Sequence, residues 1–268
     1  MARPGRKAYL LIALFALALV ALPFLFWYAT WFGRKLDDAQ LDEYFADREK
    51  PRHAQHALVQ LGERLSHHQN VSRWYPQVLA QASSPNLELR QTAAWIMGQD
   101  RAYQPFHEAL RRLIHDPVPM VRRNAALGLA AFGDAAARPE LVAMLRPSTI
   151  VAPAGGELHY RLKPEEYVNP GTLVARVGSV EVRAAVPGEV RALDAADGSR
   201  VQAGQPLADL SADQNHVWEA LRGLYLVGER DDLEDVRRFT HPVAGMPEVV
   251  QQQAANTAQA IESRPPTP

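Results

Sequence analysis

The sequence contains no cysteine. This absence excludes disulfides, thiolate catalysis and cysteine-based zinc sites, and it leaves the redox compartment open. An excess of charge of one sign is also missing, because 29 lysines and arginines stand against 30 aspartates and glutamates. The composition therefore gives no indication of nucleic-acid binding. The apolar content of 47% is enough for substantial cores, and 268 residues allow one or two ordinary domains.

Residue patterns that carry chemistry are scarce as well. The sequence has no nucleophile elbow, phosphate loop or pair of catalytic acids. His53 and His56 stand at i, i+3 on a predicted helix, a spacing that can hold a metal. No further ligand completes the set, so we interpret them as solvated surface histidines. We predict no catalytic, metal-binding or cofactor-binding residues, no small-molecule substrate, and a protein that is not an enzyme.

A long uncharged run near the amino terminus is the first feature present. Residues 8–33 are mainly leucine, alanine and phenylalanine, and Trp27, Tyr28 and Trp31 gather at the far end. A helix of this length spans roughly 39 Å, against a hydrocarbon core of about 30 Å. The pattern predicts a transmembrane anchor in residues 1–33. A cleaved signal peptide fits less well, because its apolar region is shorter and ends in small residues.

The charges beside this run predict an orientation. Arg3, Arg6 and Lys7 precede it, while Arg34 and Lys35 follow it among acidic residues. The positive-inside rule favours a cytoplasmic amino terminus. We therefore expect a single-pass protein of the inner membrane with its soluble part in the periplasm, if the source is Gram-negative.

Helical repeats account for much of the remainder. In residues 116–134, Pro117 suits a first helical position, and Val121, Ala125 and Leu129 form one apolar stripe. A shorter amphipathic run follows directly. Two short helices of this kind cannot bury their apolar faces alone, so we expect them to stack on further copies.

The copies lie 32 and 68 residues earlier and 95 residues later. Four predicted helix pairs carry the pattern, and one more apolar stripe lies in residues 247–261. The predicted helix pairs are residues 51–66 with 71–82, 85–98 with 103–115, 117–132 with 139–146, and 213–228 with 231–239.

These segments resemble HEAT repeats of the short, alanine-rich bacterial kind. The resemblance rests on Asp116-Pro117, Val121-Arg122-Arg123, Ala125-Ala126 and Gly133. It implies an α-solenoid with an extended concave surface for a protein partner. In such arrays, arginines at the places of Arg90 and Arg122 usually form a hydrogen-bonded ladder with acidic groups such as Asp116, so we expect a structural role for these three residues.

Residues 149–210 interrupt the repeats with short apolar alternations rich in valine, glycine and proline. This composition predicts strands and turns. The segment is duplicated internally: residues 154–158 resemble 186–190, and residues 168–174 resemble 201–207. It is similar to the biotinyl/lipoyl-like barrel-sandwich hybrid found in carrier domains and in periplasmic adaptor (membrane-fusion) proteins. The turn glycines of this β module are predicted to be Gly156, Gly171, Gly188 and Gly204.

The carrier function is testable from the sequence. Carrier domains attach their cofactor to a lysine in the hairpin between the two halves, which here is residues 176–181 and contains none. Lys163 is the module's one lysine and stands away from this joint. Covalent carriage is therefore not expected. Many adaptors also insert a helical hairpin at the joint and add further β domains, and this sequence has neither.

Two aromatic residues are candidates for partner recognition. Trp74 and Tyr75 either pack between repeats, which the pattern favours, or lie exposed as recognition aromatics.

Together these features predict an α+β multidomain protein. The expected parts are an anchor (1–33), HEAT-like repeats (34–147), the β module (148–211), continued repeats (212–263) and a disordered tail (264–268). We expect a membrane-anchored, non-enzymatic scaffold or adaptor that binds proteins at the cell envelope, in transport or envelope assembly. The alternatives are an accessory or carrier-like subunit of a membrane-associated enzyme complex, and a cytoplasmic regulator of a lyase-like or phosphate-linked enzyme.

Overall fold

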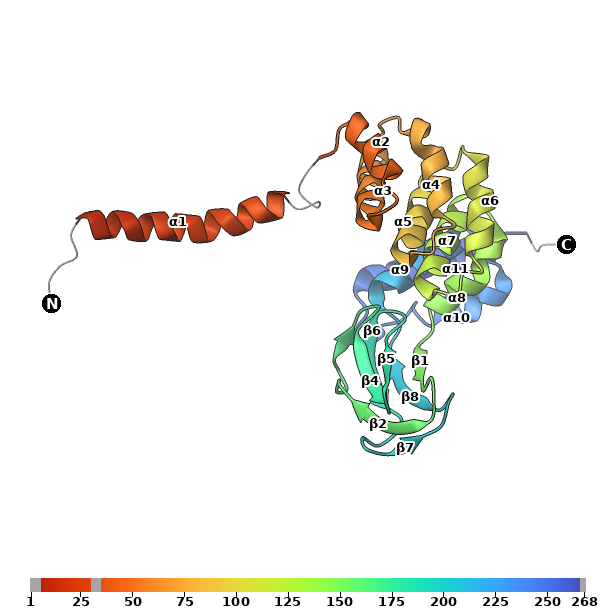
Figure 1. Cartoon of the computed structure of the whole chain (residues 1–268). Coiled ribbons are helices and arrows are strands. Elements are labelled where there is room, and N and C mark those ends of the chain that lie inside the picture. The colour runs from red at the N-terminus through yellow and green to blue at the C-terminus, as the bar shows by residue number, and fades with distance from the viewer. Residues whose placement is uncertain (1–5, 30–34, 266–268) are drawn as a thin grey trace. The chain divides into compact units, whose positions relative to one another are not determined.

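The computed structural model describes residues 6–29 and 35–265 (Figure 1). The chain forms two compact units, Met1–Arg73 and Trp74–Pro268.

The first unit contains α1 (Arg6–Ala29), α2 (Asp38–Ala46) and α3 (Pro51–Ser66). Asp37 begins α2 with a capping box, in which its carboxylate accepts from the Gln40 amide and the Gln40 side chain accepts from the Asp37 amide. Helices α2 and α3 pack through apolar residues that include the fully buried Leu41. Arg64 of α3 adds hydrogen bonds to the Leu36 carbonyl and to Asp38.

The predicted membrane anchor is not supported. Among the residues that the structure describes, no helix is long and apolar enough to cross a membrane. The side chains of Trp27 and Tyr28, and all of Trp31, lie outside the described residues. The predictions of a transmembrane helix, an inner-membrane location and a periplasmic orientation are therefore wrong.

The second unit contains eight described α-helices and the β module. The helices are α4 (Tyr75–Gln81), α5 (Leu87–Met97), α6 (Gln104–Leu113), α7 (Pro119–Ala131), α8 (Arg138–Met144), α9 (Gln214–Val227), α10 (Leu233–Arg237) and α11 (Glu248–Glu262). Short 3-10 turns precede α8 at Ala135–Ala137 and α10 at Arg230–Asp232.

The boundary between the units differs from the expected organisation. It separates the two segments predicted as the first helix pair, since α3 belongs to one unit and α4 to the other. Helix α4 also begins later than expected, at Tyr75, where Pro76 occupies an early helical position.

Consecutive repeats in the second unit stack through α5, α7, α9 and α11, each of which contacts the next. Glycines allow these contacts to be close. A Cβ atom on Gly98 of α5 would lie 2.8 Å from the Gly128 Cα of α7, and a Cβ atom on Gly223 of α9 would lie 2.9 Å from the Leu141 Cδ1 of α8. Helix α9 therefore packs on α7 and α8 as the next repeat would, although the whole β module lies between them in sequence.

The β module consists of eight short strands in two antiparallel sheets (Figure 1). The orders are β1-β8-β6-β3 and β5-β4-β2-β7. The strands are β1 (Ser148–Val151), β2 (Gly156–Tyr160), β3 (Tyr167–Val168), β4 (Leu173–Val177), β5 (Val180–Arg183), β6 (Gly188–Leu193), β7 (Arg200–Val201) and β8 (Pro206–Leu210).

The internal duplication of the sequence relates these two sheets. It matches β2 with β6, β3 with β7 and β4 with β8, so the order of one sheet maps onto the order of the other. Each sheet therefore takes two strands from each half of the module. Inward-facing residues of both halves, among them Leu158, Val174, Val190 and Leu207, form one shared core.

The four glycines at matching positions of the internal duplication have two different roles. Gly171 and Gly204 lie in turns with φ of 87° and 80°, a backbone conformation that favours glycine. Gly156 and Gly188 instead begin strands β2 and β6. A Cβ atom on Gly188 would lie 2.5 Å from the Ser211 carbonyl oxygen, so close backbone approach requires glycine there.

Candidate protein-binding groove

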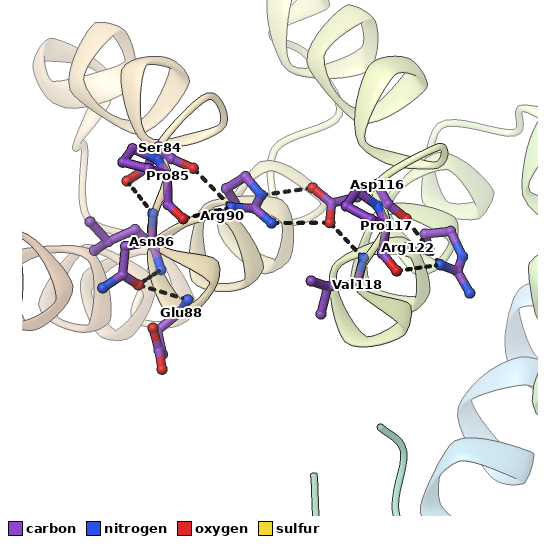
Figure 2. A network of polar contacts seen from close by, with 10 residues as sticks. Ser84, Pro85, Asn86, Glu88, Arg90, Asp116, Pro117, Val118 and Arg122 are labelled. Carbon is purple, nitrogen blue, oxygen red and sulfur yellow. Dashed lines mark hydrogen bonds and ion pairs between the residues drawn. The ribbon is translucent and has the colours of Figure 1, made fainter. Parts of the chain in front are cut away.

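The arginine ladder connects two repeats (Figure 2). Arg90 donates through Nε to one oxygen of Asp116 at 2.7 Å and through a terminal nitrogen to the other at 3.2 Å. It also donates to the carbonyls of Ser84 and Pro85 in the loop before its own helix. Burial alone would raise the pKa of Asp116, but the hydrogen bonds from Arg90 and from the Val118 amide hold it below its ordinary value.

The same arrangement begins again one repeat later and then changes. Arg122 donates to the carbonyls of Asp116 and Pro117, as Arg90 does to its own loop (Figure 2). Its Nε, however, donates to Glu140 of α8 at 2.9 Å. The residue that would take the place of Asp116 before α9 is Ser211, whose hydroxyl accepts from Glu189 in the β module. The ladder therefore stops where the module is inserted.

The two candidate recognition aromatics lie inside the unit. Trp74 is 1% exposed and Tyr75 is 5% exposed. Tyr75 packs against the rings of Tyr103 and Phe106, and its hydroxyl donates to Asp100. Both side chains are therefore buried, and the contacts of Tyr75 join α4 to the next helix pair.

The histidine pair of α3 is placed differently from the prediction. His56 is 4% exposed and contacts the ring of Tyr44 edge-on, while His53 stacks on the same ring and lies 2.8 Å from Asp47. Within the described residues, no group of three or more histidine, aspartate or glutamate side chains could hold a metal ion.

The joint between the halves of the β module is a tight β4–β5 hairpin. Val177 pairs with Val180 across it, and Gly178 adopts a φ of 58°. Lys163 lies in the loop between β2 and β3, away from this hairpin. The chain offers no amine at the position where carrier domains attach their cofactor.

A groove of about 1010 Å³ lies along the array of the second unit. Its walls are formed by α5, α7, α9 and α11, the four helices that stack directly on one another. The lining combines three kinds of residue. Small residues form much of the floor, and exposed apolar and amide side chains stand around them.

Three large apolar side chains are exposed in this groove. Trp95 of α5 is 48% exposed, and Tyr225 and Leu226 of α9 are 46% and 50% exposed. Amide side chains lie beside them from the turn after α5, from α7 and from α11. These are Gln99, Asn124, Gln253, Asn256 and Gln259.

The groove contains little net charge. One acid and one base line it, Glu219 and Arg222, and Arg222 lies over the ring of Trp218 at 4.6 Å. Burial raises the pKa of Glu219, against the effect of Arg222, and Asp213 raises it further. A neutral surface with aromatic and amide groups is suited to uncharged peptide segments, because an amide side chain can both donate to and accept from a peptide bond.

Sequence reasoning identified the helices but not this groove. The repeat pattern placed apolar stripes on α5, α7 and α9, and those stripes are buried. The groove is formed by the residues between the stripes, and three of its amides come from the last helix. The run of glutamine, asparagine and alanine in α11 is the one feature that could have indicated a polar binding surface.

The comparisons with known proteins agree with the helical part of this description. Residues 75–152 match a family model for HEAT repeats. A search of curated proteins finds no match. HEAT repeats typically form scaffolds for protein–protein interaction. The second unit is therefore HEAT-like in its helical part, while no family match covers the β module.

Proposed function

We propose that this protein is a non-enzymatic scaffold that binds an extended segment of a partner protein in the groove formed by α5, α7, α9 and α11. The observation that carries the proposal is the joint exposure of Trp95, Tyr225 and Leu226 in that groove. Large apolar side chains are normally buried, and aromatic residues dominate the binding energy of protein interfaces.

The shape of the groove favours an extended chain over a folded domain. It runs across four stacked helices of successive repeats, and amide groups are distributed along it. Such groups can bond to the main chain of a bound peptide at several points, while Trp95 and Tyr225 contact its side chains. The near-neutral lining favours an uncharged, partly apolar sequence.

The test is a selection of displayed peptides on the full chain, followed by affinity measurements with single variants. Trp95→Ala and Tyr225→Ala should each weaken the selected peptides by about 30-fold, the effect of losing one interface anchor worth about 2 kcal/mol. Leu87→Ala is the matched control, since Leu87 is also on α5 and 42% exposed but does not line the groove. Peptides that bind the Trp95→Ala and wild-type chains equally well would disprove the proposed site.

A further inference from the structure

A second cavity, of about 710 Å³, lies where the β module meets the repeats. Helices α7 and α8 and strand β1 form one part of its wall, and β5 with the loop after it forms another. None of its residues lines the groove described above. Much of the wall is apolar, including Pro119, Ile150, Val182, Val186 and Leu210.

Four arginines also line this junction cavity, and three of them have a carboxylate within hydrogen-bond distance. Arg122 bonds to Glu140 at 2.9 Å, Arg183 to Glu181 at 2.6 Å, and Arg146 to Asp235 at 2.7 Å.

Arg123 is the fourth arginine, and its surroundings are different. It is 8% exposed, and its Nε has no hydrogen-bond partner. The Oε1 of Glu140 lies 4.0 Å from this nitrogen, beyond hydrogen-bond distance. One terminal nitrogen donates to the Nδ1 of His216. A histidine nitrogen that accepts from a guanidinium carries no proton, so His216 is neutral in this contact and does not balance the charge of Arg123.

The remaining nearby acid is already engaged. Asp213 acts on Arg123 at longer range, but its carboxylate caps α9 by accepting from Asn215 and His216 and also accepts from the Tyr167 hydroxyl. A buried guanidinium with an unsatisfied donor is costly, and a carboxylate partner would remove that cost.

We propose that the junction cavity binds a ligand with an apolar body and a single carboxylate, which pairs with the guanidinium of Arg123. The volume lies within the range of small-molecule sites. The pairing of the other three arginines limits the ligand to one negative charge. Two sources share this chemistry, a free alkanoate and the terminal carboxylate of an apolar peptide.

The experiment measures binding to the full chain by ligand-observed NMR and calorimetry. The probes are octanoate with octanamide, and acetyl-Val-Pro-Val with a free or an amidated carboxyl terminus. We expect one acid to bind at least ~10-fold more tightly than its amide, because a charge-assisted hydrogen bond is lost with the carboxylate. The pair that shows this preference identifies the source.

Two variants separate binding from folding. Arg123→Gln should abolish the preference for the acid. Val151→Trp should block the cavity without touching Arg123, since Val151 lines it and is 47% exposed. Arg112→Gln, an exposed arginine outside the cavity, is the charge control. Circular dichroism verifies that each variant is folded. The proposal fails if neither acid binds better than its amide, or if folded Val151→Trp retains the preference.

Discussion

Arg138 of α8 holds both carboxylate oxygens of Asp232, 94 positions later in the sequence. The two hydrogen bonds measure 2.8 Å and 3.2 Å. Asp232 is largely buried and also accepts from the Glu229 amide at 2.8 Å, at the start of the turn before α10. This ion pair joins the repeats that precede the β module to those that follow it.

Asp232→Ala should reduce the free energy of unfolding by about 2–4 kcal/mol, because it leaves the guanidinium of Arg138 without its main partner. Chemical denaturation measures the change, and a double-mutant cycle with Arg138→Ala isolates the pair. Arg237 and Glu262 provide the control, since this exposed pair should contribute under about 1 kcal/mol. A cycle energy near zero for Arg138 and Asp232 would contradict the prediction.

Gly98→Ala should destabilise the second unit by roughly 1–3 kcal/mol through overpacking. The new methyl group would lie 2.8 Å from the Gly128 Cα, and backbone atoms cannot move away as a flexible side chain can. Thermal unfolding measures the effect. The exposed neighbour Gln99→Ala is the control and should change stability little, and an unchanged melting temperature for Gly98→Ala would show that the helices adjust freely.

Acid should weaken the junction at His216. Burial, followed by the charge of Arg123, lowers its pKa to about 4, and Asp213 opposes the shift only in part. Because the unfolded chain binds this proton near pH 6.5 and the folded chain near pH 4, stability is complete above pH 6.5. It should fall by roughly 2–3 kcal/mol as the pH drops to 4. His216→Asn keeps an acceptor for Arg123 but does not titrate, so its stability should change less across this window. Parallel curves for the two proteins would refute the assignment.

The β module should be removable. Ser148 in β1 pairs directly with Leu210 in β8, so the module leaves and re-enters the array at neighbouring points. Replacing residues 148–210 with a short glycine-serine linker should leave α9 packed on α7 and α8. Far-ultraviolet circular dichroism and a single cooperative transition are the readouts. The control is the chain that keeps the module. If the shortened chain shows less helical signal than this control, the repeats depend on the module.

The helical repeats were predictable because their pattern is local and repeated. Pro117 and the stripe from Val121 to Leu129 place α7 within a few residues of its observed bounds, and the spacing of 32 identifies both arginines of the ladder. The strand-and-turn character of residues 149–210 follows from composition in the same way. Periodicity records which face of an element is buried, and these faces are indeed the buried ones.

The candidate sites were not predictable for the opposite reason. Arg123 and His216 are 93 residues apart, and only the packing of α9 on α7 brings them together. The groove depends on residues between the apolar stripes, where the periodic pattern carries no information. The burial of His56 likewise depends on neighbours that no local pattern names.

The exchange of strands between the halves of the β module has a consequence for synthesis on the ribosome. Each sheet needs strands from both halves, so one sheet is incomplete until β7 has emerged and the other until β8 has emerged. The repeats up to α8 contain mainly local contacts and can form earlier. Helix α9 follows β8 directly, so its docking site on α7 and α8 stays uncovered during translation of the entire module. While the β module is being translated, the nascent chain therefore exposes the surface of α7 and α8 that α9 later covers. A chaperone would have the most surface to bind during this period.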